Sequence, residues 1–179
     1  MTILQVKEIS KIYTSRLGAQ KVQALSSVSF DVESGEFVAI MGESGSGKTT
    51  LLNILAALDT PTSGQVLLEG RDFAAIPEKD RAAFRRDHLG FVFQDFNLLD
   101  TFSLKDNVLL PLVLRSTPVK DMDATLAPLM EKLGLHGLEN KYPWEVSGGQ
   151  KQRAAVARAL ITAPQLCFPR TVYQGRRSL

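Results

Sequence analysis

Residues 42 to 49 combine glycines, a lysine and a hydroxyl at a spacing suited to holding a polyphosphate. Gly42 is followed, after four residues, by Gly47, Lys48 and Thr49, which is the GxxxxGK[ST] pattern. Glycines let backbone N–H groups approach phosphate oxygens, because a Cβ would block positive φ or close contact. We expect Lys48 to reach the β- and γ-phosphates and the Thr49 hydroxyl to ligate Mg²⁺. The predicted binding residues here are Gly42, Glu43, Ser44, Gly45, Ser46, Gly47, Lys48, Thr49 and Thr50.

The segments on either side of this loop predict a strand and a helix that would position it. Residues 37–41 form a short apolar run, as expected of a buried parallel strand. After the loop, apolar residues recur at the spacing of one helical face, at Leu51, Ile54, Leu55 and Leu58. The alternative is a flexible Gly/Ser turn that matches by accident, and the flanking patterns favour phosphate binding. The loop alone does not distinguish among classes of nucleotide-hydrolysing proteins.

A second motif, about a hundred residues later, also predicts an anion-binding helix N-terminus. Ser147 and Gln150 have the S-x-x-Q spacing of a capping box, which would open a helix through about Ile161. Gly148 and Gly149 lie in its first turn, where each costs about 1 kcal/mol relative to Ala. A well-capped helix start is the simpler interpretation. The two glycines favour a site where backbone N–H groups closely approach a ligand.

Composition places the chain among ordinary globular proteins, with 44% hydrophobic and 22% charged residues over 179 positions. The net charge is +2, but residues 1–166, with 18 basic and 19 acidic side chains, carry −1. This balance does not indicate a nucleic acid partner. The single cysteine, Cys167, excludes an internal disulfide. With no signal-peptide pattern and no apolar run near the ~20 residues of a membrane-spanning helix, we expect a soluble, non-exported protein.

The hydrophobic periodicity predicts one domain that mixes strands and helices. Strands are expected at 3–9, 28–32, 65–69 and 89–93, with residues 11–13 leading into a loop and a short helix over 77–86. From about 95 to 146 the pattern becomes helical, and Ser103 with Asp106 resembles a capping box. A helical stripe there ends at Gly134 and comprises Leu126, Leu129, Met130 and Leu133. We interpret this region as a helical subdomain inserted into an α/β body.

The phosphate loop, Gln94 at a strand end and Ser147-Gly148-Gly149-Gln150 together resemble the nucleotide-binding subunit of an ATP-binding cassette (ABC) transporter, over residues 1 to about 166. The resemblance implies a P-loop NTPase core with a mostly parallel sheet, an antiparallel N-terminal edge layer and a helical insert. It implies ATP and Mg²⁺ as cofactors, and catalytic roles for Lys48 and Gln94. Gln94 would contact the Mg²⁺ or the attacking water; alternatively, it is a strand-end hydrogen bonder. Tyr13 would stack on the adenine; alternatively, it covers a sheet edge.

The resemblance also implies two protein partners. Residues 147–150 would contact the γ-phosphate bound to the other subunit of a head-to-tail homodimer. A separate permease subunit would hold this chain at the inner face of the cell membrane, as a peripheral cytoplasmic protein. Residues 93–99 and 141–147 are most similar to the bacitracin-type branch of the peptide, lipoprotein-releasing and macrolide systems. This likeness implies that ATP binding and hydrolysis drive export or release of a peptide-like or lipophilic substrate.

The end of the sequence departs from that family. After residues 159–166 the family continues with an apolar strand ending in Asp-Glu, which positions Mg²⁺ and the attacking water. Here no acidic residue follows Glu145, and Pro169 is expected to interrupt a central strand. His88 and His136 lie too early to serve as the family's switch histidine. We interpret residues 167–179 as an aberrant tail, from truncation or a frameshift after 166, in an incomplete nucleotide-binding domain.

Two functional hypotheses follow from these features. The chain is an ATP-driven transport subunit, as both motifs indicate, or a non-hydrolysing ATP-binding remnant, as the missing carboxylates indicate. A GTPase or small kinase that uses the same loop would leave Gln94 and residues 147–150 unexplained.

Overall fold

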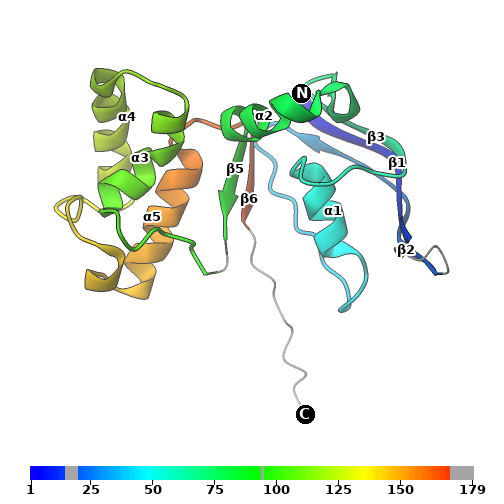
Figure 1. The fold of residues 1–179 in the computed structure, drawn as a ribbon, viewed down its shortest axis with the longest axis horizontal. Coiled ribbons are helices and arrows are strands. Elements are labelled where there is room, and N and C mark those ends of the chain that lie inside the picture. The colour runs from blue at the N-terminus through cyan, green and yellow to red at the C-terminus, as the bar shows by residue number, and fades with distance from the viewer. Residues whose placement is uncertain (15–19, 94, 170–179) are drawn as a thin grey trace, which may run out of the picture. The chain divides into compact units, whose positions relative to one another are not determined.

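The computed structural model describes residues 1–14, 20–93 and 95–169, and divides the chain into two compact units, Met1–Ala82 and Ala83–Leu179 (Figure 1). The described residues of the first unit form four strands, one α-helix and two short 3-10 helices. These are β1 (Thr2–Thr14), β2 (Lys21–Glu33), α1 (Lys48–Leu55), β3 (Ser63–Leu68), β4 (Arg71–Asp72), η1 (Phe73–Ala75) and η2 (Glu78–Asp80). The second contains most of α2 (Arg81–His88), then β5 (Leu89–Val92), α3 (Leu104–Leu114), α4 (Val119–Lys132), η3 (Pro143–Glu145), α5 (Gly148–Leu160) and β6 (Leu166–Pro169). The α/β class is confirmed, whereas the single-domain organisation stays a prediction.

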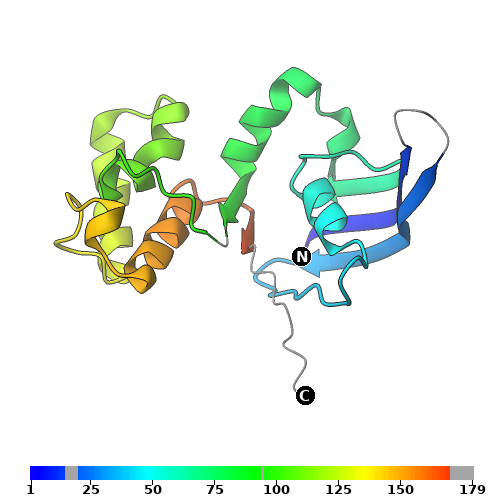
Figure 2. The same cartoon turned by 60° about the horizontal axis from the view of Figure 1, so that its bottom comes forward.

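An antiparallel sheet in the order β2-β1-β3-β4 forms the first unit, which confirms the predicted N-terminal antiparallel layer. The central strand β1 pairs on both edges, with Val6 opposite Phe30 on one side and Val66 on the other. Residues 11–13, expected to lead into a loop, instead continue β1 to Thr14. Helix α1 lies on one face of this sheet (Figures 1 and 2). The side chains buried there include Leu4, Val6, Ile9, Leu25, Val66 and Leu68 of the sheet and Leu51, Ile54 and Leu55 of the helix.

The prediction of a strand at 37–41 is wrong, because these residues join neither sheet of the described structure. Phe37 and Met41 are 85% and 87% exposed. An apolar run becomes a strand only where a neighbouring strand satisfies its backbone N–H and C=O groups, and none pairs with this segment here. Leu58 also departs from the predicted helical face, since α1 ends at Leu55 and Leu58 is exposed.

Parallel pairing in the described residues is confined to β5 and β6, less than the mostly parallel sheet expected from the resemblance. Leu89 lies opposite Leu166, and the rings of Phe91 and Phe168 stack with centroids 5.6 Å apart. Pro169 does not interrupt this strand as predicted. It is the last residue of β6, opposite Val92. A proline is tolerated at a strand end because its missing N–H breaks no further ladder bond.

Helices α3, α4 and α5 enclose the core of the second unit (Figure 1). Ser103 begins α3 with the predicted capping box, its Oγ accepting from the Asp106 N–H at 3.1 Å. The predicted stripe on α4 is confirmed, with Leu126 and Met130 buried and Leu129 and Leu133 packed beside them. The buried members of this core are Leu104, Val108, Leu109, Leu112, Met122, Leu126, Met130, Leu135, Ala154, Ala157 and Ile161.

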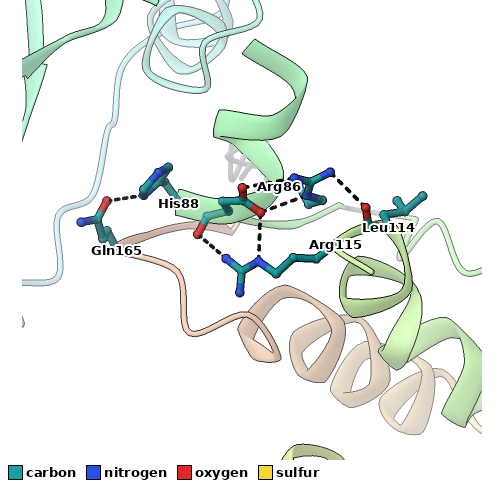
Figure 3. Close-up of polar contacts among 6 residues, drawn as sticks. Arg86, His88, Leu114, Arg115 and Gln165 are labelled. Atoms are coloured by element: carbon teal, nitrogen blue, oxygen red, sulfur yellow. Dashed lines mark hydrogen bonds and ion pairs between the residues drawn. The ribbon is translucent and has the colours of Figure 1, made fainter. Parts of the chain in front are cut away.

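A polar network joins the end of α2 to the end of α3 (Figure 3). The Asp87 carboxylate accepts from Arg86 Nε at 2.9 Å and from Arg115 Nε at 3.0 Å. Arg86 Nη1 also donates to the carbonyl of Leu114, the last residue of α3, at 3.0 Å. The hydrogen bond from Arg86, followed by that from Arg115, holds the pKa of Asp87 below its ordinary value despite partial burial.

Candidate functional site

The phosphate loop ends at the N-terminus of α1, where Gly47 is the N-cap residue. Gly47 caps this helix with a left-handed φ of +87°, and no side chain in the described part of the chain caps it. The backbone N–H groups of Lys48, Thr49 and Thr50 open the helix and have no carbonyl one turn earlier to bond. This uncapped end carries partial positive charge, so it offers an anion several aligned donors.

Gly47 is required by sterics as well as by its backbone angle. A Cβ at this position would lie 2.3 Å from the Ala24 carbonyl oxygen and 2.8 Å from Leu25 Cδ2, both on β2. Gly45 also has a positive φ, of +83°, but a Cβ there meets nothing within 4 Å. The loop is therefore fixed against β2 at Gly47 and open at Gly45.

The Lys48 ammonium lies inside the curve of its own loop. Its Nζ donates to the carbonyl oxygens of Gly42 at 2.8 Å and Glu43 at 2.6 Å, and to Ser46 Oγ at 3.3 Å. Three oxygens of the loop thus hold the cation where a phosphate bound by the helix N-terminus would meet it. Gly42, Glu43, Ser46, Gly47 and Lys48 are brought together as the motif predicts.

Thr49 is the one predicted Mg²⁺ ligand that the structure describes. In the described ranges no three His, Cys, Asp or Glu side chains converge as a metal site. This donor set still fits Mg²⁺, which proteins commonly hold through one or two side chains plus substrate phosphates and water. The Thr49 hydroxyl would hold the ion beside phosphate oxygens, where the ion neutralises charge on the polyphosphate.

Tyr13 lies near the same loop although it is distant in sequence. It sits at the end of β1, opposite Val22 of β2, and is 42% exposed. Two and three residues further along β2 are Ala24 and Leu25, the residues against which Gly47 is fixed. The structure therefore places an accessible aromatic ring and the phosphate loop at one end of the first unit.

Lys11 and Asp59 surround Tyr13, and the sequence analysis missed both. The Tyr13 hydroxyl donates to Asp59 Oδ2 at 2.9 Å, and Lys11 Nζ donates to Asp59 Oδ1 at 2.6 Å. Burial acts to raise the pKa of Asp59, but the hydrogen bonds from Lys11, Tyr13 and the Thr60 N–H, with the charge of Lys11, lower it overall. No spacing rule links residue 11 to residue 59, so only the folded chain reveals this cluster.

The second motif begins α5 with the predicted capping box. Ser147 Oγ accepts from the Gln150 N–H at 3.3 Å, and Gln150 Oε1 accepts from the Ser147 N–H at 2.7 Å. A Cβ on Gly148 would meet nothing within 4 Å, and one on Gly149 only Arg153 Nη1 at 3.8 Å. The described packing does not require either glycine, so the fold itself does not account for their cost to the helix.

Gln94 lies outside the described residues, but α5 holds the segment that follows it. Phe96 and Asn97 have positive φ angles of 61° and 46°. Arg158 donates to their carbonyl oxygens, at 2.7 Å for Phe96 and 2.6 Å for Asn97. Arg158 was not identified from the sequence, where it reads as an ordinary charge near a helix end.

The described helices include none that is both long and apolar enough to cross a bilayer. His88, the last residue of α2, lies with its Nδ1 2.9 Å from Gln165 Oε1 (Figure 3).

Comparison with known proteins identifies the family. The sequence matches the ABC transporter family over residues 25–168. It is 47% identical over 168 residues to the bacitracin export ATP-binding protein BceA of Halalkalibacterium halodurans, covering 94% of this chain and 66% of that protein. It is 50% identical over 164 residues to the ABC transporter ATP-binding protein YxdL of Bacillus subtilis, covering 92% and 63%. The chain thus spans slightly less than two thirds of the length of these curated relatives.

A solved structure agrees with this assignment. The ATP-binding cassette MJ0796, in a dimeric post-hydrolysis state bound to ADP and Pi, superposes with a TM-score of 0.78 at 35% identity. The match covers 93% of this chain and 73% of that one. The resemblance inferred from the phosphate loop and from residues 147–150 is confirmed, and the chain belongs to the ABC transporter family.

Proposed function

We propose that this chain is an ATP-binding subunit that couples ATP binding and hydrolysis to transport through a separate membrane permease. The observation that carries the proposal is the loop at α1, with its left-handed Gly47, uncapped N–H groups and enclosed Lys48 ammonium. Backbone donors would cradle the β-phosphate while Lys48 neutralises the β- and γ-phosphates. Thr49 would hold Mg²⁺, and Gln94 would orient the ion or the attacking water.

The second anion-binding helix start supports a head-to-tail homodimer with ATP at the interface. Residues 147–150 present a helix N-terminus whose glycines leave room for close approach from outside the chain. MJ0796 is dimeric in its ADP- and Pi-bound state. By analogy, the phosphate that approaches residues 147–150 would belong to an ATP bound by a second copy of this chain. Each ATP would then contact the loop of one subunit and the helix start of the other.

The relatives favour a substrate that is peptide-like or lipophilic. BceA is a bacitracin export protein, and this chain shares 47% of its residues over the matched region. Substrate would bind the permease, since this chain contributes energy coupling rather than a transport path. We propose peripheral attachment at the cytoplasmic face of the membrane, through contacts made by the helical region and the segment around Gln94.

A non-hydrolysing ATP-binding protein is the second candidate. Residues 146–179 contain no aspartate or glutamate, so no side chain of this stretch offers a carboxylate that could activate water. Such assistance contributes about 10²- to 10⁴-fold in rate. A phosphate-release assay beside an ATP-binding assay separates the two candidates, because only the first predicts turnover.

The direct test of nucleotide binding is the Lys48→Ala variant. Removing the ammonium while leaving the glycine backbone intact should lower ATP affinity by at least ~10-fold, as expected for losing a hydrogen-bonding charge. The thermal midpoint of unfolding should change little, since the hydrogen bonds that Lys48 Nζ makes within the described residues all go to its own loop. Titration with labelled ATP measures the change, and Lys79→Ala removes an exposed lysine of the same unit as control. Equal binding by the parent and the Lys48 variant would refute the proposed site.

A further inference from the structure

Residues 59–62 run beside the last residues of β1 as a strap. Beyond the Ser10–Ser63 pair, β3 no longer pairs with β1, and this strap supplies the hydrogen bonds instead. The Thr62 N–H donates to the Ser10 carbonyl at 2.8 Å, and Thr62 Oγ1 accepts from the Ile12 N–H at 3.0 Å. Together with the side-chain bonds of Asp59, these contacts fix the end of β1 where Tyr13 projects.

Lys11 is held against one face of the Tyr13 ring by this strap. Its Nζ donates to Asp59 Oδ1 at 2.6 Å and to the Thr60 carbonyl at 2.7 Å. The same nitrogen lies over the Tyr13 ring, 4.9 Å from the centroid, and the Lys11 side chain is only 12% exposed. A cation at this distance is attracted to the ring face. The cation thus occupies one face of Tyr13, and the ring keeps exposed surface for a second stacking partner.

Asp59 fixes the Tyr13 ring from its other end. Oδ2 of Asp59 accepts the Tyr13 hydroxyl while Oδ1 of the same carboxylate holds Lys11. Rotation of the ring about its Cα–Cβ bond would break the hydroxyl bond and remove the cation contact together. The carboxylate therefore sets both the direction of the ring and the face that Lys11 covers.

The same residues tie Tyr13 to the phosphate loop at two points. The Asp59 N–H donates to the carbonyl of Asn53 in α1, the helix that the phosphate loop opens. Across the sheet, Lys11 lies opposite Leu25, the residue that the Cβ of a substituted Gly47 would strike. The ring is thus held at a fixed position relative to the loop, within the first unit.

We propose that Asp59 and Lys11 are positioning residues that hold Tyr13 ready to stack on the base of a bound nucleotide. This inference rests on the proposed function, which supplies the nucleotide. Base stacking on an aromatic side chain is worth about 5- to 150-fold in affinity. Pre-fixing the ring spares the ordering cost that a free side chain would meet on binding. Because every base has a π-face, the cluster favours a nucleotide over bare polyphosphate without selecting one base.

The test compares ATP with inorganic tripolyphosphate, which lacks the base and sugar. Affinities of both ligands are measured by calorimetry on the full chain and on Tyr13→Ala, Tyr13→Phe, Asp59→Asn and the Tyr13→Ala/Asp59→Asn double variant. We expect Asp59→Asn to weaken ATP about 3- to 10-fold, the range of one lost hydrogen bond, with tripolyphosphate unchanged within about twofold. Tyr13→Phe keeps the ring and should show a similar selective loss. Asp31→Asn removes an exposed aspartate of β2 and serves as the matched control.

The double variant separates positioning from general destabilisation. If Asp59 acts through the ring, Asp59→Asn causes no further loss once Tyr13 is alanine. The inference would be overturned if the ratio of ATP affinity to tripolyphosphate affinity were equal in the parent, Asp59→Asn and Tyr13→Phe. In that case, tripolyphosphate binding that still depends on Lys48 would leave the proposed function standing. If Asp59→Asn does not fold, the inference is judged from the ratio of ATP affinity to tripolyphosphate affinity in Tyr13→Phe compared with the parent. Failure of both ligands to respond to Lys48→Ala would instead refute the proposed function.

Discussion

At the scale of single residues, Gly47 and Gly45 share a left-handed backbone but differ in their surroundings. Alanine at either position carries the left-handed penalty of about 1–2 kcal/mol. At Gly47 the Cβ also strikes the Ala24 carbonyl at 2.3 Å, a backbone atom that cannot move aside cheaply. We therefore expect Gly47→Ala to lower the free energy of unfolding by at least ~2 kcal/mol more than Gly45→Ala does. Urea denaturation of the two variants measures the difference, and equal losses would show that β2 does not confine the loop.

Asp87 offers a test of the polar network through pH. Its folded pKa is lowered first by the Arg86 hydrogen bond, so its stabilisation is fully present above the ordinary aspartate pKa. That stabilisation is lost as pH falls through the lowered folded value. Asp87→Asn should thus reduce the free energy of unfolding by about 1 kcal/mol at pH 7, allowing for partial exposure.

The same difference should shrink as the pH falls from about 4, the ordinary aspartate pKa, through the lowered folded value, because the carboxyl is protonated first in the unfolded chain and then in the folded protein. Chemical denaturation at several pH values measures it, and Asp100→Asn, at an exposed turn, is the control. A difference that is constant from pH 7 to pH 3 would mean that Asp87 acts by packing rather than by charge.

Residues whose chemistry depends on local spacing could be identified from the sequence alone. Lys48 and Ser147 belong to short motifs in which the backbone itself brings the groups together. Lys11, Asp59 and Arg158 contribute through contacts with residues 46 to 62 positions away. Hydrogen bonds between residues so far apart in the sequence depend on the register of β1 and on the strap, residues 59–62. No local pattern of residue types predicts either of these.

At the scale of elements, the first turn of α5 contains a glycine that the surrounding structure does not require. Gly148 has helical surroundings with open space for a Cβ. Gly148→Ala should therefore raise the free energy of unfolding by about 0.5–1 kcal/mol. The added methyl would also occupy the surface where a partner's phosphate is proposed to approach, so ATP-dependent dimerisation should weaken.

These opposite effects distinguish a functional glycine from a structural one. Urea denaturation gives the stability, and light scattering with and without ATP gives the dimer fraction. Thr125→Ala improves helix propensity on the exposed side of α4 and should stabilise without affecting dimerisation. A Gly148→Ala protein that is less stable than the parent would contradict the open space seen around this glycine.

The strands show why element prediction succeeded in one part and failed in another. β1 and β3 alternate apolar and polar residues, and each finds partners: β1 pairs with the next strand β2 and also with β3, where Leu4 lies opposite Leu68. Residues 37–41 are equally apolar, but a parallel strand needs partners from distant segments, and the described chain gives it none. Periodicity reports which residues can be buried in a strand, and it does not report whether a neighbouring strand is present.

At the scale of the whole molecule, the two helix starts proposed to bind phosphate belong to different compact units, residues 1–82 and 83–179. If each ATP needs the loop of one subunit and residues 147–150 of another, damage to one motif leaves the other motif of that chain usable. Lys48→Ala removes the first half-site and Gly149→Asp, which adds a negative charge at the helix start, removes the second. Each variant alone should fail to dimerise with ATP, because every site then contains one damaged half.

Mixing the two variants should restore part of the ATP-dependent association. A mixed dimer combines the intact loop of the Gly149→Asp chain with the intact residues 147–150 of the Lys48→Ala chain, which completes one of its two sites. Fluorescence transfer between differently labelled variants measures mixed dimers, and the Lys48→Ala/Gly149→Asp double variant mixed with either single variant is the control, because it completes no site. Association of each variant alone to the parental level would show that residues 147–150 do not bind a partner's nucleotide. Failure of the mixture, with both variants folded, would limit the proposal to dimers that need two complete sites.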